Sequence, residues 1–530
     1  MHLNHHSLQQ IDAAYIQSLE PEALRNLSVR LLADLKEAWD RLNQGPDNSS
    51  RPPSSRAPWE RTGCGSASAE DAAAGEPMPD SAEAKPVDVQ PVEAQPAEAQ
   101  PAEGKPVDMQ PVDSPPKRKP GKQPGAPGFG RTQVFHAHEE QGHYPPGCAG
   151  CGQPLVGAPT VAYTGFQVVD LRLGEPGQPG LTLWVVDHRY YEAVCGCGHR
   201  TRAVAAQGEV DPLLAGIELS EWRLVGPELA TLIVALAQRF RLSRARIQEF
   251  LSEWLGLTLS IGTIHQTIHE AGAVVAPAEA ELIEAVLASD LLHADETSWP
   301  EHGQPLWLWV FHSLTVTLYY VAGRGRELVD NVLDGFSGWL MSDGWIAYRH
   351  YPRRLRCWAH LLRKARGLAQ SCDREAQCFG RQVLKTLETL MAAVYAAREG
   401  PPAVDLPTQH APALAELRAA CERYRGSDHG KTHALAVELL NDWAAIFTVL
   451  SHPELPLTNN DAERALRHWV ILRKLTWGTR TPVGSRVVAV LASVIDTCRQ
   501  RGHSPWRYLA RAIADRRAGL PLPPLPQSGD

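Results

Sequence analysis

The sequence contains no stretch that approaches the roughly 20 consecutive apolar residues of a membrane-spanning helix. Its first residues, Met1-His-Leu-Asn-His-His-Ser7, also lack the basic region and apolar run of a secretion signal. We therefore expect a cytoplasmic protein that has no contact with a membrane. Without a secretion signal, the cysteines favour metal binding over a disulfide framework.

The formal net charge of −8 is unevenly distributed. Residues 67–116 hold eleven acids and two lysines, so the rest of the chain is slightly basic, at +1. Residues 349–366 carry seven Arg or Lys and no acid, and residues 459–517 carry twelve against four acids. Positive charge concentrated in this way is typical of a surface that binds nucleic acid. For any single basic residue, an ordinary solvated helix face is the alternative.

The first 45 residues predict one or two helices. Apolar residues recur at spacings of three and four from Leu24 to Leu42, and Gly45-Pro46 ends the pattern. This short seam fits either a coiled-coil dimerisation segment or a helix packed against its own chain. Residues 46–133 are rich in proline and acidic residues and predict a disordered, extended linker.

Residues 134–205 predict a small β-rich unit around grouped cysteines, with strands over 160–171 and 181–194. A C-x-x-C pair precedes these strands and a tighter C-x-C pair follows them. Four thiolates suit tetrahedral zinc. His199 is an alternative fourth ligand, and buried free thiols are the alternative without metal. The candidate zinc ligands are Cys148, Cys151, Cys195 and Cys197.

Residues 206–280 predict a helical domain. Two helices, over about 243–255 and 260–271, flank the short segment Gly256-Leu-Thr-Leu259, which is the spacing of a helix-turn-helix. Two packed helices with no role in DNA binding fit the pattern equally well. If the second helix enters a DNA groove, its small or polar residues would face the bases. These residues are Thr263, His265, Gln266 and Thr267.

From residue 281 the pattern changes to strands and helices that alternate along the chain. The order of these elements is that of an α/β, ribonuclease-H-like domain, in which the first and fourth strands lie side by side. Residues 281–370 would form its first part, 371–457 a helical insertion, 458–520 its C-terminal helices and 521–530 a tail. Strands are expected over 288–294, 306–313, 316–322, 339–342 and 354–358, and helices over 326–333 and 360–369.

Three carboxylates stand in separate settings within this part of the chain. They are Asp295 in His293-Ala-Asp-Glu-Thr-Ser-Trp299, Asp343 in Met341-Ser-Asp-Gly-Trp345, and Glu463 in Asn459-Asn-Asp-Ala-Glu-Arg-Ala-Leu-Arg467. Carboxylate oxygens are the ligands that Mg²⁺ takes from proteins, and two metals about 4 Å apart support polynucleotidyl transfer. Taken singly, each acid is explained as well by a strand end, a turn or a helix cap.

Together these segments resemble the DDE transposases of the insertion-sequence sixty-six family. The resemblance runs nearly end to end and rests on the joint order of short motifs along the chain. Besides the three acidic segments, these motifs are Asn48-Ser-Ser-Arg-Pro-Pro-Ser-Ser55, Arg324-Gly-Arg-Glu327, Arg356-Cys-Trp-Ala-His-Leu361, Leu457-Thr-Asn-Asn460, Arg473-Lys-Leu-Thr-Trp-Gly-Thr479 and Cys498-Arg-Gln500.

The resemblance implies a transposase that cuts DNA at the ends of an insertion sequence and joins the freed 3′-hydroxyl to target DNA. Asp295, Asp343 and Glu463 would hold two Mg²⁺ or Mn²⁺ ions, with Asp295 shared by both. The neighbouring acids Glu296 and Asp461 would take supporting or solvent-facing positions. The resemblance also implies a zinc-finger-like unit with the same tight second cysteine pair, which would hold one structural Zn²⁺.

Basic residues close to these acids are the candidates for contacts with DNA phosphates. For His360, a structural hydrogen bond at a helix start is the alternative. Trp477 is expected in the core, with stacking on an unpaired base as the alternative, and Thr458, Asn459 or Asn460 is expected to cap the helix that bears Glu463. The candidate DNA-binding residues are His360, Arg464, Arg467, Arg473 and Lys474.

The expected partners are DNA, further copies of the chain in a homo-oligomer, and accessory proteins of the same mobile element. One alternative function is a DNA-binding regulator with a catalytically inactive ribonuclease-H-like fold. Another is a nuclease that cuts DNA without joining it. Metal-dependent strand transfer would exclude the regulator, and the joining of pre-cut ends would exclude the nuclease.

Overall fold

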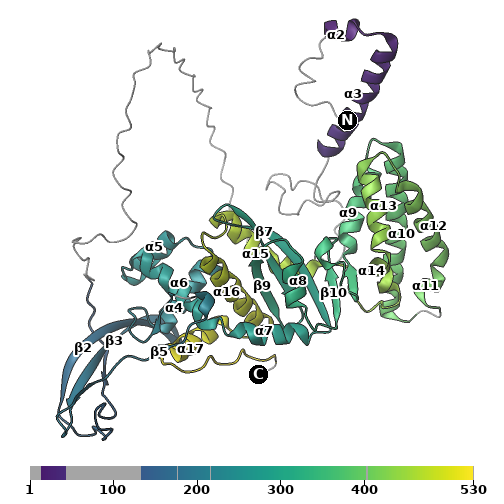
Figure 1. Cartoon of the computed structure of the whole chain (residues 1–530). Helices are drawn as coiled ribbons and strands as arrows, with labels where there is room; N and C mark the ends of the chain where they lie inside the picture. The colour runs from purple at the N-terminus through teal and green to yellow at the C-terminus, as the bar shows by residue number, and fades with distance from the viewer. Residues whose placement is uncertain (1–12, 43–132, 176, 215, 402–403, 529–530) are drawn as a thin grey trace, which may run out of the picture. The chain divides into compact units, whose positions relative to one another are not determined.

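The computed structural model describes residues 13–42, 133–175, 177–214, 216–401 and 404–528 (Figure 1). The predicted linker over 46–133 and the helix stop at Gly45-Pro46 lie almost entirely outside the described residues. At the N-terminus, α2 (Ala13–Gln17) and α3 (Pro21–Leu42) are helical, as the sequence predicts. Along the predicted seam of α3, Leu27 and Leu31 are half-buried, whereas Leu24 and Leu35 are exposed. The described residues therefore cover the apolar stripe of α3 only in part.

The cysteine-bearing unit is built on a long hairpin. Strands β2 and β3 pair antiparallel from Thr160 opposite Ala193 to Glu175 opposite Gln178. Strand β1 adds to β3 in parallel and β4 adds to it antiparallel. The N–H of Val169 in β2 donates to the carbonyl of Leu224, 2.7 Å away, which ties the hairpin to the helical region that follows. The strands are β1 (Glu139–His143), β2 (Thr160–Glu175), β3 (Gln178–Val194) and β4 (Arg200–Arg202).

The predicted helix pair forms as α5 (Arg244–Leu255) and α6 (Ile261–Val275). Helix α5 agrees with the prediction within one residue, whereas α6 continues four residues beyond its predicted end at 271. Ser243 and Ser260 cap the two helices by accepting hydrogen bonds from the N–H groups of Arg246 and Thr263. Gly256 ends α5 in the left-handed region, with φ of 62°, a conformation that glycine adopts without steric cost. Helices α4 (Pro227–Val234) and α7 (Ala278–Leu287) flank the pair.

One prediction for this helix pair is wrong. The side chain of Thr267 is buried and donates its hydroxyl to the carbonyl of Thr263, one turn earlier. Its spacing from Ile264 and Ile268, both buried, places it on the packed face of the helix. His265 and Gln266 are exposed, so of the four residues they are the ones that a groove could reach.

A five-stranded sheet forms the centre of the second half, in the order β11-β10-β7-β8-β9 (Figure 1). Strands β7, β8 and β9 make an antiparallel meander, β10 pairs with β7 in parallel, and β11 pairs with β10 in parallel. Successive β8 residues point to opposite faces. Leu308 and Val310 pack with Trp469 of the C-terminal region, whereas Trp309 and Phe311 belong to the larger core on the other face. The strands are β7 (Leu291–Glu301), β8 (Gln304–His312), β9 (Thr317–Ala322), β10 (Trp339–Ser342) and β11 (Arg354–Arg356).

The first strand of this sheet differs from the prediction. It was expected over 288–294 with Asp295 at its end, but α7 continues to Leu287 and β7 runs from Leu291 to Glu301. Pairing with β8 continues past Asp295, which lies opposite Val310, as far as Glu301 opposite Gln304. This long-range pairing extends the strand, so Asp295 lies within β7.

Helices complete this half of the molecule. A short helix, α8 (Glu327–Val332), connects the meander to β10, and α9 (Trp358–Ala369) follows β11. The segment that was expected to be a helical insertion contains α10 (Arg374–Glu399), α11 (Leu406–Gln409), α12 (Ala411–Tyr424), α13 (Gly430–Asn441) and α14 (Trp443–Phe447). The C-terminal helices are α15 (Asn460–Thr476), α16 (Pro482–Gln500) and α17 (Pro505–Arg517).

Among the described residues, no single helix is long and apolar enough to cross a membrane. One bent pair, Gly430–Asn441 with Trp443–Leu450, satisfies the length and composition criteria together, with a bend of 75°.

Candidate active site

The register of two parallel strands places Asp295 beside Asp343. Strands β7 and β10 pair with His293 opposite Met341. Asp295 and Asp343 each lie two residues beyond this pair, so both emerge at the same point along adjacent strands. The carboxylate of Asp343 accepts the backbone N–H of Trp345 at 2.7 Å, and that of Asp295 accepts the N–H of Glu296 at 2.9 Å.

Glu463 reaches the same place from the first turn of α15. Asn459 lies at the start of this helix but does not cap it with its side chain, contrary to the prediction for its position. The Asn459 amide instead donates to the carbonyl of Ala294 at 2.9 Å, and its oxygen lies 3.2 Å from Nδ1 of His293. These buried contacts fix the beginning of α15 against β7, immediately next to Asp295.

The carboxylates of Asp295, Asp343 and Glu463 interact electrostatically. Burial raises the pKa of Asp295 well above its ordinary value of 3.8, and the charges of Asp343, Glu296 and Glu463 raise it further. Burial also raises the pKa of Glu463. The charge of Asp343 raises it further, whereas the charge and hydrogen bond of Arg363 lower it. Like charges held together in a partly buried place disfavour ionisation. A divalent cation would remove this repulsion, so the donor set fits a site for hard metal ions.

Neighbouring side chains hold two of the acids in place. The side chain of Glu296 is 1% exposed and is bound by Arg324, at 2.8 and 3.1 Å, and by the hydroxyl of Tyr348 at 3.0 Å. Arg363 and Nε2 of His360 lie 3.5 and 3.6 Å from the same oxygen of Glu463. Sequence reasoning gave no role to Arg324, Tyr348 or Arg363. Arg324 begins one of the ordered motifs that carry the family resemblance, and Arg363 lies at helical spacing from His360.

The two rival acids differ in their surroundings. Glu296 is enclosed by its partners, which agrees with a supporting position. Asp461 is partly exposed, pairs with Arg464 and lies 3.6 Å from Nε2 of His293. We define the carboxylate cluster as Asp295, Asp343 and Glu463, and the choice of these acids over Glu296 and Asp461 stays a prediction.

His360 is the most perturbed of the basic candidates. Burial, together with the charges of Arg363, Lys364 and Arg356, lowers its pKa to about 3, so the ring is neutral at physiological pH. Its Nε2 faces Glu463, and within the described residues its buried Nδ1 has no hydrogen-bond partner. A neutral ring with an unused nitrogen can orient the Glu463 carboxylate or accept a hydrogen bond from a ligand.

The four other basic candidates lie along α15. Arg464 is 73% exposed and pairs with Asp461. Arg467 and Lys474 are also exposed. Arg473 is different, because its guanidinium donates to Oγ1 of Thr297 at 2.7 Å and to Oγ of Ser298 at 2.9 Å. It thus joins the end of α15 to β7. Contact of these residues with DNA stays a prediction.

Trp477 corrects a further expectation. It was expected in the core, but its side chain is 83% exposed. It ends α15 in the left-handed region with φ of 58°, where a bulky residue is rare. The next residue, Gly478, lies so close to the carbonyl of Pro300 that no side chain would fit there. Attachment of this turn to the end of β7 explains why Trp477 points outward.

The four cysteines of the N-terminal unit meet in space. Their Sγ atoms lie within 4.8 Å of one another, with Cys148 and Cys197 3.7 Å apart and Cys151 and Cys195 3.6 Å apart. His199 is not a member of this group. Four sulfurs at this spacing suit a tetrahedral zinc ion with bonds of about 2.3 Å. Because the two pairs come from loops after β1 and β3, one ion would join both ends of the unit.

Two proteins of one organism are similar in sequence to parts of this chain. An uncharacterised protein of Sinorhizobium fredii, y4qI, is 26% identical over 271 residues, which is 45% of this chain and 50% of that protein. A second uncharacterised protein of the same organism, y4jO, is 33% identical over 78 residues, which is 14% of this chain and 24% of that protein. The chain thus spans half the length of the first relative and about a quarter of the second.

A sequence model described as the Transposase IS66 family matches residues 223–487. The match covers 265 of the 530 residues and includes the carboxylate cluster, His360 and Arg473. The helix pair, the central sheet and the start of α15 all lie within it. The chain belongs to the Transposase IS66 family.

Proposed function

We propose that this protein cuts DNA at the ends of a mobile element and joins those ends to target DNA. Family membership supports a DNA-cleaving and DNA-transferring enzyme at a coarse level. The observation that carries the specific proposal is the carboxylate cluster, in which three acids meet from separate elements: the charges of Asp343 and Glu463 add to the raised pKa of Asp295, and the charge of Asp343 adds to that of Glu463. A set of acids that is unfavourable without cations is the arrangement expected of a metal-dependent nuclease site.

The catalytic domain in this proposal is ribonuclease-H-like. The sheet order β11-β10-β7-β8-β9, with an antiparallel meander followed by two parallel strands, supports it. Residues 281–370 and 458–520 would form this domain, interrupted by the helical insertion over 371–457. The unit over 134–205 with its zinc, and the helical domain over 206–280, would recognise the element ends. Helix α3 and other surfaces would assemble the oligomer.

Asp295, Asp343 and Glu463 would hold two Mg²⁺ or Mn²⁺ ions. When bound, these ions lower the pKa of an attacking water and stabilise the leaving oxygen. The chain's own task is then to position the ligands. Asn459 holds α15 against Ala294, and Arg363 and His360 hold the Glu463 carboxylate. This chemistry needs no serine, tyrosine or cysteine nucleophile.

The test is cleavage and strand transfer on a duplex that carries the inverted repeat flanking the gene. We expect the wild-type protein to cut and join this duplex with Mg²⁺ or Mn²⁺ and to bind Mn²⁺ in calorimetry. Asp295→Ala, Asp343→Ala or Glu463→Ala should lose cleavage by at least about 10³-fold and should weaken Mn²⁺ binding, while DNA binding in chelator is retained.

The matched control is Asp334→Ala, which removes an exposed acid between α8 and β10. It should leave cleavage and strand transfer unchanged. Cleavage by any of the three alanine variants at the wild-type rate would overturn the assignment. Cleavage without joining, even of pre-cut ends with free 3′-hydroxyls, would favour the nuclease, and binding without either reaction would favour the regulator.

A further inference from the structure

A cavity of about 530 Å³ adjoins Asp343 on the side that faces the helical insertion. Its walls come from four parts of the chain: the loop between β9 and α8, the segment after β10, helix α9, and helix α13 of the insertion. Its volume lies in the range of small-ligand sites, about 300–1,000 Å³. The ionisable residues in its wall are Arg324, Asp343, Arg349, His360, Lys364 and Glu438.

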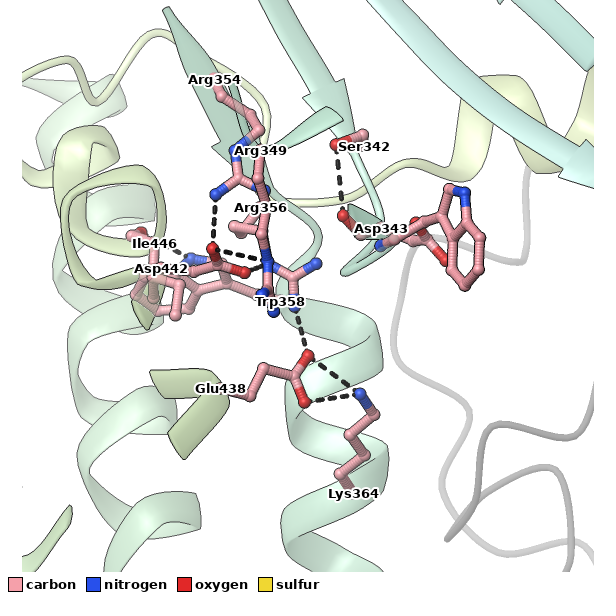
Figure 2. Close-up of polar contacts among 11 residues, drawn as sticks. Ser342, Asp343, Arg349, Arg354, Arg356, Trp358, Lys364, Glu438, Asp442 and Ile446 are labelled. Carbon is pink, nitrogen blue, oxygen red and sulfur yellow. Dashed lines mark hydrogen bonds and ion pairs between the residues drawn. The ribbon is translucent and has the colours of Figure 1, made fainter. Parts of the chain in front are cut away.

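The cavity lies against an ionic network with a surplus of positive charge (Figure 2). Arg356 bridges Glu438 and Asp442 at 2.5 and 3.2 Å, and Arg354 binds Asp442 at 2.5 Å. Lys364 contacts both oxygens of Glu438, at 2.7 and 2.9 Å, and Arg349 lies 3.6 Å from Asp442. Four cations thus share two carboxylates, so this network carries two more positive than negative charges.

Part of this surplus is buried behind the cavity wall. Arg356 is only 1% exposed, and within the described residues its Nη1 has no hydrogen-bond partner. Both terminal nitrogens of Arg356 lie directly behind Gly344 of the wall, since a Cβ built there would lie 2.7 Å from Nη1 and 2.8 Å from Nη2. In Figure 2 the second of these nitrogens, Nη2, points to Glu438. A partly buried network with a net positive charge is costly, so its surroundings favour an anion.

Two further cations in the wall are accessible. The side chains of Lys364 and Arg349 are 34% and 36% exposed. Each can therefore keep its contact with the network and still present N–H groups to a ligand. The unpartnered Nε1–H of Trp345 is a further donor at the same wall. The chemistry of the wall is that of a phosphate site.

The wall is less suited to an unstacked base. The guanidinium of Arg324 already lies over the Trp345 indole, 3.7 Å from its centre, and takes one face of that ring. A DNA strand also carries a phosphate for every 3.4 Å of helix axis or so. If Asp343 helps to hold the phosphate that is cut, a neighbouring phosphate of the same strand comes within reach of the cavity.

We propose that this cavity binds a non-scissile phosphate of the DNA strand, one or two positions from the bond that is cut. Lys364 and Arg349 contact that phosphate, and Arg356 supplies buried positive charge behind it. The helical insertion takes part because Glu438 of α13 orients Lys364 and Arg356. This inference rests on the proposed function and adds a substrate subsite that the carboxylate cluster does not require.

The experiment is a double-mutant cycle that combines the substitution of one side chain with the neutralisation of one phosphate. Duplexes with the element's inverted repeat carry an uncharged methylphosphonate at single positions on either side of the cut. We expect one position to slow wild-type cleavage about ten-fold, the effect of one charge-assisted contact. Lys364→Gln should slow cleavage of the native duplex equally, and the methylphosphonate should then add little. Arg349→Gln should behave in the same way at the same position.

Lys385→Gln, which removes an exposed lysine of α10, is the matched control and should show the full methylphosphonate effect. Binding in chelator gives a readout without catalysis. There Lys364→Gln should reduce the salt dependence of binding by about one phosphate contact, and Lys385→Gln should not.

Additive effects of Lys364→Gln and methylphosphonate at every position would overturn the subsite while leaving the proposed function intact. The same holds if the Lys364→Gln defect merely follows a fall in Tm, because a purely structural network has no preferred phosphate. If the wild-type protein fails to cut any element-end duplex, the proposed function itself fails and the subsite falls with it.

Discussion

The four-cysteine cluster and the carboxylate cluster gather ionisable side chains in opposite ways. The cysteines lie in two loops supported by a small apolar group, Cys148, Leu155 and Ala193. The carboxylates lie on a sheet whose two faces are covered by much larger cores. An ion at the cysteines would therefore supply much of the local stability. At the carboxylate cluster the fold is already built, and it holds the acids together against their repulsion.

Removal of the ion at the cysteines should have the largest structural effect. We expect chelation of zinc, or Cys151→Ser, to unfold the loops around the cysteines, because structural zinc contributes on the order of 10 kcal/mol in small units. Hydrogen exchange should rise sharply near residues 146–158 and 195–202 but not in β7. Cys372→Ser, at an exposed cysteine outside the cluster, is the control. Unchanged exchange near the cysteines would show that they need no metal.

Asn459→Ala should loosen the attachment of Glu463, on α15, to Asp295, on β7. It removes buried contacts with Ala294 and His293, so we expect unfolding to become easier by about 2 kcal/mol. Cleavage should fall by more than this loss of stability explains, since Glu463 is no longer fixed against Asp295. The control is Asn460→Ala, at the exposed neighbour. Equal activity of the two variants would show that α15 does not need this anchor.

Asp295→Asn should stabilise the metal-free protein while it abolishes cleavage. It removes a buried charge beside Asp343 and Glu463, and we expect a gain of about 1 kcal/mol, or a few degrees in Tm. The measurement is thermal unfolding in chelator, with Asp334→Asn as the control. A lower Tm for Asp295→Asn would contradict the view that the fold opposes this repulsion.

The pH dependence of the stability gained by Asp295→Asn follows from the direction in which the pKa of Asp295 is shifted. The pKa of Asp295 is raised in the folded protein, so the folded state binds more protons than the unfolded state above the ordinary value of 3.8. Stability from this group is complete below 3.8 and is lost as the pH rises through the folded value. The advantage of Asp295→Asn in chelator should therefore be absent near pH 3.5 and grow toward neutral pH.

The smallest expected effects separate DNA contact from structure on α15. Arg467→Gln should leave Tm unchanged and reduce the salt dependence of DNA binding by about one contact, because Arg467 is exposed. Arg473→Gln should lower Tm, because Arg473 donates to Thr297 and Ser298 of β7. If Arg467→Gln leaves the salt dependence unchanged, Arg467 does not belong to the DNA surface.

Elements with strong local signals were predictable from the sequence. The helix pair has serine caps at Ser243 and Ser260 and a glycine at Gly256, and the boundaries set by these residues agree with the prediction within one residue. Strand β10 has the predicted bounds, Trp339–Ser342, because it is a short apolar run bounded by polar turns. Family membership was also predictable, since it rests on ordered short motifs.

Features that depend on distant partners were not predictable. The extent of β7 is set by pairing with β8, and the outward position of Trp477 by the contact of Gly478 with Pro300. Asn459 resembles a helix cap in sequence but binds Ala294 and His293, more than 160 residues away. The charge surplus around Arg356 arises only when α9, β11 and α13 meet.

The order of acids, cysteines and basic segments is determined by the sequence alone, because residue identity and short-range spacing do not depend on the fold. That order alone specified the family and named the carboxylates. Which of those acids repel one another, which cations are shared and where positive charge is left over required the folded protein. The reason is that electrostatic energies depend on separation and burial, and both are properties of packing.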